Sequence, residues 1–112
     1  MNLNFNYKGK KISLNVVRCS WIGRIIGLMF SRREGALALL FDFGKPTRNP
    51  IHSMFVFFPF VGIWIDENGK VVDLRVVKPW KLSILPTEKF VKLIEIPINK
   101  RYMGLVSSLV GS

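Results

Sequence analysis

The chain has 112 residues, of which 49% are hydrophobic, 12% aromatic and 21% charged. A chain of this length is expected to form one domain, residues 1–112. A composition so rich in aromatic residues excludes an intrinsically disordered chain. The 17 lysine and arginine residues outnumber the 7 acidic ones, and the net charge of +10 favours nucleic acid, anionic lipid or acidic proteins as partners.

The N-terminal sequence MNLNFNYKGKKISLNVV predicts a β-hairpin, because polar and apolar residues alternate along it. Gly9 and Lys10 suit the centre of a type II′ turn. In that register three apolar pairs share one face: Tyr7 with Ile12, Phe5 with Leu14, and Leu3 with Val16. The same alternation lacks the continuous apolar segment of a signal peptide, so we expect a cytoplasmic location.

The next segment predicts one short helix and then a strand. Ser20 can cap a helix that extends to Phe30, and Arg32 and Arg33 follow its C-terminal end, where the helix dipole favours cations. The sequence ALALLFDF, residues 36–43, predicts a strand. The glycine, proline and asparagine content of residues 44–50 indicates a loop.

The most apolar segment is MFVFFPFVGIWI, residues 54–65. It is too short for a transmembrane helix, which needs about 20 apolar residues, and Pro59 would interrupt a helix. Residues 54–58 are apolar at consecutive positions, which predicts a central strand covered on both faces. Phe57 is therefore expected in the core.

A second hairpin is predicted around Asn68 and Gly69, the strongest short hairpin signal in the chain. This hairpin predicts that the segment ending at Ile65 is a half-buried strand, with Trp64 beside Asp73 on the outer face. The apolar pairs of the other face are Ile65 with Val72, Ile63 with Leu74, and Val61 with Val76. A four-residue loop over residues 66–69 would shift these partners and leave each residue on the same face.

A last strand is predicted over residues 91–98, followed by one helical turn in the tail. The fold class is therefore α+β and β-rich. We expect a small, strongly curved sheet or partly open barrel of about seven strands, with one principal short helix that covers one opening.

Six strings occur in the order and spacing of a known family: GLMF (27–30), ALLF (38–41), IHSMFVFFP (51–59), WIDENGKVV (64–72), KPW (78–80) and LIEIP (93–97). Over about residues 18–105 the chain resembles the archaeal form of the prokaryotic family called domain of unknown function 192. The resemblance implies a compact β-rich domain and no defined activity. Many bacterial members of that family look exported, whereas this chain shows no signal sequence.

Two positions depart from the pattern of that family. The family usually has an aspartate in a Pro-apolar-Asp arrangement, and here Pro59 and Phe60 are followed by Val61. The family usually ends with Gly-Asp and a final strand, and here Gly104 is followed by Leu105. The resemblance therefore does not carry an acidic or metal-binding role to these two positions.

The residue types of a thiol triad are present in Cys19, His52 and either Asp66 or Asp73, but their spacing matches no nucleophile motif. A single cysteine excludes an intrachain disulfide and a thiolate metal cage. No P-loop and no G-x-G-x-x-G motif is present. We therefore expect no cofactor and no metal, and an enzyme is the less favoured interpretation.

Glu95 lies within the apolar string LIEIP, which places its carboxylate near the core edge. A buried charge without a partner is costly, so we expect a structural ion pair with Arg24, or with Arg18 as the second candidate.

Four basic residues flank the strand at 36–43, Arg32 and Arg33 at one end and Lys45 and Arg48 at the other. With Trp80, they are the candidate site for weak binding of a polyanion. The sequence thus favours a monomeric, non-enzymatic binding module for nucleic acid or an acidic protein. The alternative is a small-molecule binder or enzyme with a pocket between the helix and the sheet, into which His52 and a basic group would converge.

Overall fold

The computed structural model describes residues 1–19, 28 and 31–110. These residues form seven strands and two helical elements, in the order β1 (Asn2–Tyr7), β2 (Lys10–Asn15), β3 (Val17–Arg18), β4 (Leu39–Thr47), β5 (Phe60–Ile65), β6 (Val71–Val77), β7 (Phe90–Pro97), the 3-10 helix η1 (Lys100–Tyr102) and α2 (Met103–Val110). The expected β-rich α+β class is confirmed.

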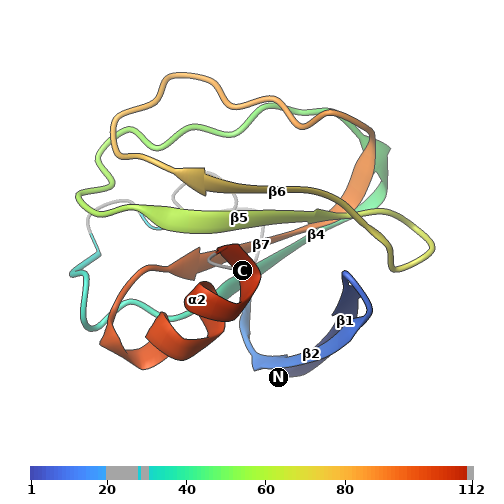
Figure 1. Ribbon diagram of the computed structural model, residues 1–112. Coiled ribbons are helices and arrows are strands. Elements are labelled where there is room, and N and C mark those ends of the chain that lie inside the picture. Colours follow the sequence, from blue (N-terminus) through green and yellow to red (C-terminus); the bar gives the residue numbers. More distant parts are fainter. Residues whose placement is uncertain (20–27, 29–30, 111–112) are drawn as a thin grey trace.

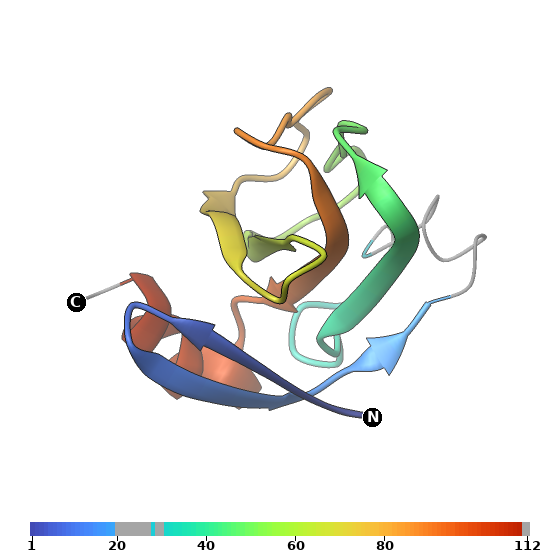
Figure 2. The same ribbon diagram turned by 90° about the vertical axis from the view of Figure 1, so that its right-hand side faces the viewer.

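Strands β1 and β2 form a separate hairpin, and the other five form one sheet in the order β3-β4-β7-β5-β6. The hairpin and α2 lie on one side of this sheet, and the long loops after β4 and β6 lie along the other side (Figure 1). Figure 2 shows that β4 and β7 curve strongly around the interior. The described sheet is curved but does not close into a barrel, because β3 and β6 are its two edges.

The first hairpin turns at Lys8 and Gly9, one residue earlier than expected. Both residues have positive φ, 48° and 77°, which is the requirement of a type I′ turn. Phe5 therefore pairs with Ile12, and not with Leu14. The alternating pattern has a period of two, so a shift of two residues leaves every side chain on its predicted face.

Strand β4 begins at Leu39 and continues through Gly44 to Thr47, where the sequence indicated a loop. The ladder with β7 is irregular between Asp42 and Thr47. At this point Gly44 has a φ of 75° and donates its amide hydrogen to Asp42 Oδ1 at 3.0 Å. Glycine and proline signals accompany bulges as well as loops, and here they mark a bulge that bends the strand.

The central strand is β5, residues Phe60–Ile65, and all six of its residues are buried. The prediction that residues 54–58 form a buried central strand is wrong. These residues form no strand, and Phe57 is 60% exposed. The rule that consecutive apolar residues indicate a strand covered on both faces applies instead to the second half of the apolar segment, since β5 is buried on both of its faces.

Two apolar clusters cover the two faces of β5. One cluster joins Val61 and Ile63 to the first hairpin and to α2, whose Val106 and Leu109 are buried. The other lies under the long loops and is made of Leu28, Ala36, Phe41, Val56, Phe58, Phe60, Trp64, Val77, Ile84, Phe90 and Leu93. Trp64, expected on an outer face, is therefore fully buried. The second hairpin otherwise keeps its predicted pairs, except that Ile65 pairs with Val71 across a bulge.

The helix expected over residues 20–30 lies outside the described residues, apart from the buried Leu28. The helix in the described part of the chain is α2, eight residues long, where the sequence predicted one turn.

Candidate binding site around Trp80

Three aromatic side chains are grouped on the surface of the two long loops. The ring centre of Trp80 lies 5.1 Å from that of Phe55 and 5.5 Å from that of Phe57, in edge-to-face geometry. Their exposed fractions are 46%, 40% and 60%. Val56 and Phe58 alternate with them and are buried, so that residues 55–58 are anchored in the core while two phenylalanine rings face solvent.

A single buried serine joins the two loops that carry these rings. Ser53 Oγ donates a hydrogen bond to the carbonyl of Lys78 at 2.6 Å and accepts one from the amide of Lys81 at 2.7 Å. The carbonyl of Ser53 accepts from the amide of Trp80 at 2.8 Å. The amide of Ser53 also donates to the carbonyl of Lys81 at 2.8 Å. Because four backbone groups of the loop after β6 meet at Ser53, hydrogen bonds fix the position of that loop relative to the loop that carries Phe55.

Two of the three exposed aromatic residues have left-handed backbone conformations. The φ angle is 60° at Phe55 and 63° at Trp80. A bulky residue with positive φ is a genuine outlier, and such strain costs of order 1–3 kcal/mol. Strained residues that also expose large rings are concentrated at binding sites, so this feature identifies the loops as a functional candidate.

A basic hollow of about 320 Å³ is lined by Lys78 and Lys81, which flank Pro79 and Trp80 in the chain. Arg75, Lys78 and Lys81 line it over an apolar floor of Val77 and Ile84, and none of its described lining residues is acidic. Arg75 also pairs with Asp73 at 2.8 Å, which reduces its share of the positive field. We name the three rings and these three cations together the Trp80 surface.

The predicted polyanion-binding residues are not brought together. Arg32 and Arg33 precede β4, whereas Lys45 and Arg48 lie at and beyond its bulge, so the length of the strand separates the two pairs (Figure 2). Arg33 Nε donates to the carbonyl of Ile98 at 2.8 Å, and an Arg48 Nη donates to that of Pro86 at 3.0 Å. Both arginines thus also hold loops in place. Trp80 belongs to a different group of side chains.

Glu95 is buried, as its apolar neighbours predicted, with an exposed fraction of 6%. Burial raises the pKa of its carboxyl from the usual 4.5 to about 8. The second candidate partner is wrong, because Arg18 is exposed and contacts Asp42 at 3.4 Å. The pair with Arg24 stays a prediction, since Arg24 lies outside the described residues.

The residue types of a thiol triad are dispersed in the fold. Asp66 accepts hydrogen bonds from the amides of Asn68 and Lys70 in the hairpin turn, and Asp73 is paired with Arg75. Burial, followed by the nearby charge of Glu95, raises the pKa of the Cys19 thiol, which opposes formation of the reactive thiolate. Within the described ranges, no three histidine, cysteine or acidic side chains are grouped to hold a metal ion.

Sequence reasoning missed five residues of this surface, Phe55, Phe57, Arg75, Lys78 and Lys81. It also missed the buried Ser53 that joins the two loops. An apolar run gave no sign that alternate rings face solvent, and positive φ at phenylalanine or tryptophan has no sequence signature. The one sequence feature that could have pointed to this site is Ser53, a hydroxyl residue within the apolar string IHSMFVFFP.

The fold and this surface define a small β-rich domain whose accessible chemistry is aromatic and basic. Residues 3–101 match the family DUF192 (Uncharacterized ACR, COG1430), and the chain belongs to this family. The resemblance noted from the sequence is thereby confirmed, and the match also includes the first hairpin.

Two archaeal relatives and two solved structures are similar to the chain. The UPF0127 protein PH1112 of Pyrococcus horikoshii is 33% identical over 70% of this chain and 67% of its own length. The UPF0127 protein PF1050 of Pyrococcus furiosus is 31% identical over 69% of this chain and 67% of its own length. A Sinorhizobium meliloti protein, provisionally described as a transcription regulator, has a TM-score of 0.70 at 22% identity, over 84% of this chain and 76% of that one. A Novosphingobium aromaticivorans protein of unknown function has a TM-score of 0.72 at 14% identity, over 94% of this chain and 77% of that one. These two structures show the fold alone.

No helix in the described part of the chain is long and apolar enough to cross a membrane.

Proposed function

We propose that this protein is a non-enzymatic binding module that holds single-stranded nucleic acid on the Trp80 surface. The observation that carries this proposal is that Trp80, which contacts two further exposed aromatic rings, stands in the chain between Lys78 and Lys81, two of the three cations that line the hollow. Proteins that bind single strands combine these two elements, because bases stack on aromatic rings while lysine and arginine neutralise phosphates. A duplex keeps its bases stacked internally and would use only the cations.

The charge of the site sets the expected salt dependence. Lys78, Lys81 and the partly neutralised Arg75 provide up to three phosphate contacts. For a single strand, each phosphate contact contributes about −0.7 to the slope of the logarithm of the binding constant against the logarithm of the salt concentration. Three contacts therefore predict a slope of about −2. Arg32 and Arg33 precede β4, Lys45 lies within it and Arg48 follows it, and we propose that these four residues add only non-specific attraction that duplex and single strand share.

The test is a fluorescence titration of labelled oligothymidylate and of a duplex of equal length, at low salt. Trp80→Ala should weaken single-strand binding by about tenfold, because stacking on one aromatic residue is worth about 1–3 kcal/mol. The double variant Lys78→Ala/Lys81→Ala should flatten the salt slope by about 1.4. The matched control, Lys10→Ala/Lys11→Ala, removes the same charge from the first hairpin and should change affinity much less.

Two results would contradict the proposal. One is equal binding of duplex and single strand with no effect of Trp80→Ala, which would leave only general attraction to polyanions. The other is no binding of either nucleic acid, which would direct attention to an acidic protein as the partner.

A further inference from the structure

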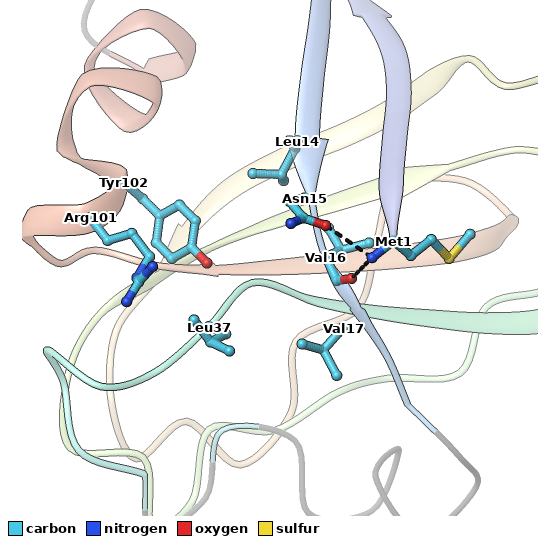
Figure 3. A pocket seen from close by; sticks show the side chains of 8 residues that line it. All are labelled: Met1, Leu14, Asn15, Val16, Val17, Leu37, Arg101 and Tyr102. Atoms are coloured by element: carbon cyan, nitrogen blue, oxygen red, sulfur yellow. Dashed lines mark hydrogen bonds between the residues drawn. The ribbon is translucent and has the colours of Figure 1, made fainter.

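A second hollow, separate from the Trp80 surface, lies between β2, β3, the segment before β4 and η1 (Figure 3). It is a half-open groove of about 360 Å³, within the size range of small-molecule sites. Its walls include Leu14, Val16, Val17 and Leu37. Val17 and Leu37 are 46% and 40% exposed, so the groove presents apolar surface to solvent.

Backbone hydrogen bonds fix these walls. The amide of Val17 donates to the carbonyl of Ala38 at 2.9 Å, and β3 runs parallel to the start of β4. On the other side, buried Asn99 donates from Nδ2 to the carbonyls of Arg33 and Ala36 at 2.7 and 3.0 Å. These bonds connect the segment before β4 to the start of η1, so the apolar walls and the polar end keep a fixed spacing.

The polar end of the groove carries two hydrogen-bond donors. Tyr102 is 8% exposed, and Figure 3 shows its hydroxyl directed into the space enclosed by the lining side chains. This hydroxyl accepts from the amide of Ala38 at 2.8 Å, and its own hydrogen has no acceptor among the described residues. The neighbouring Arg101 is exposed and, within the described chain, forms no ion pair.

Charge selects the ligand class. None of the described residues that line the groove is acidic. The amine of Met1 at the opposite end already donates to Asn15 Oδ1 at 2.9 Å and to the carbonyl of Val16 at 3.1 Å (Figure 3). A guanidinium and a hydroxyl proton at one end of an apolar groove suit an anionic group with two acceptor oxygens, since charge-assisted bonds to carboxylates are the strong ones.

We propose that this groove binds a small apolar monocarboxylate. The carboxylate accepts hydrogen bonds from Arg101 and from the Tyr102 hydroxyl, and the hydrocarbon part lies against Val17 and Leu37. This site is independent of the proposed nucleic-acid surface, which lies on the loops after β4 and β6.

The test is a ¹H–¹⁵N NMR titration of the full chain with hexanoate, with hexanol and hexylamine as probes of equal length and different charge. Hexanoate should shift the amide signals of Val17, Leu37 and Tyr102 and bind more tightly than either control. Arg101→Gln should weaken hexanoate binding by about tenfold and leave hexanol unaffected. Arg101 is exposed, so this variant should fold normally. Lys100→Gln is the matched control, since it removes a neighbouring charge that does not line the groove.

The proposal is overturned if hexanol and hexanoate bind equally, or if Arg101→Gln binds hexanoate as the unmodified protein does. Shifts confined to residues 75–81 would also overturn it, because they would place the anion in the basic hollow of the Trp80 surface.

Discussion

The indole of Trp64 lies directly over Gly62, two residues earlier on β5. A Cβ atom at position 62 would stand 2.9 Å from Cη2 of Trp64 and 3.1 Å from Cζ3. Gly62 pairs with Arg75 on one side and with Glu95 on the other, so these three residues form one row across the sheet. The Arg75 guanidinium lies 5.8 Å from the centre of the Trp64 ring.

The absence of a side chain at Gly62 is therefore a packing requirement. Gly62→Ala should destabilise the protein by about 1–3 kcal/mol, because the added methyl group would press on the ring of a fully buried tryptophan. Gly104→Ala is the control, since nothing lies within 4 Å of a Cβ atom there. Urea denaturation of both variants measures the difference, and an unchanged midpoint for Gly62→Ala would show that the core adapts.

Glu95 should make stability depend on pH. Its pKa is raised from 4.5 to about 8 in the folded protein, so the unfolded chain ionises first as the pH rises. The free energy of unfolding should be highest below about pH 4.5, fall by up to about 5 kcal/mol towards pH 8, and level off above it. Denaturation curves across this range measure the effect.

Glu95→Gln separates a neutral buried acid from the predicted ion pair with Arg24. If the carboxyl is neutral, the variant removes the fall in stability between pH 4.5 and 8 and is the more stable protein at pH 8. A variant that is less stable at every pH above 4.5 would instead indicate an ionised carboxylate with a cationic partner.

Ser53 should control the shape of the Trp80 surface. Ser53→Ala leaves the amide of Lys81 and the carbonyl of Lys78 without their partner and should destabilise the loops by about 1–3 kcal/mol. Hydrogen exchange at the Lys81 amide reports this loss directly. Ser83→Ala, at an exposed position on the loop that carries Lys81, is the control, and equal exchange rates in the two variants would contradict a special role for Ser53.

The neighbours Phe57 and Phe58 should respond very differently to truncation. Phe58 is 1% exposed, so Phe58→Ala should destabilise by about 3–5 kcal/mol, whereas Phe57 is 60% exposed and Phe57→Ala should change stability by less than about 1 kcal/mol. Thermal denaturation compares them. Similar losses in the two variants would mean that Phe57 is covered in solution.

The sequence predicted which side chains share a face much better than it predicted what covers that face. The two hairpins, the strand at the start of β4 and most of β7 follow from alternation and turn residues, which are local properties. Register in the first hairpin depended on whether the turn begins at Lys8, and alternation cannot distinguish a shift of two residues. Burial of Trp64 depended on the loops that return over the sheet, which is a long-range property.

The candidate site was less predictable than the fold. The sequence singled out Trp80 as an aromatic residue that could stack on bases, but its contacts with Phe55 and Phe57 come from a loop that lies more than twenty residues away in the chain. That approach depends on the hydrogen bonds of Ser53 and on positive φ at two aromatic residues, neither of which has a pattern that a single sequence reveals.

Mapping the contact of nucleic acid on the protein tests the central claim most directly. The measurement is a ¹H–¹⁵N NMR titration of the full chain with a short oligothymidylate at low salt. Stacking at Trp80 predicts that the Trp80 indole N–H and the amides of residues 53–57 and 78–82 shift first and most. Shifts of equal size around Lys10, Lys11, Arg32 and Arg33, with an unmoved Trp80 indole, would contradict the claim and reduce the site to one part of a uniformly basic surface.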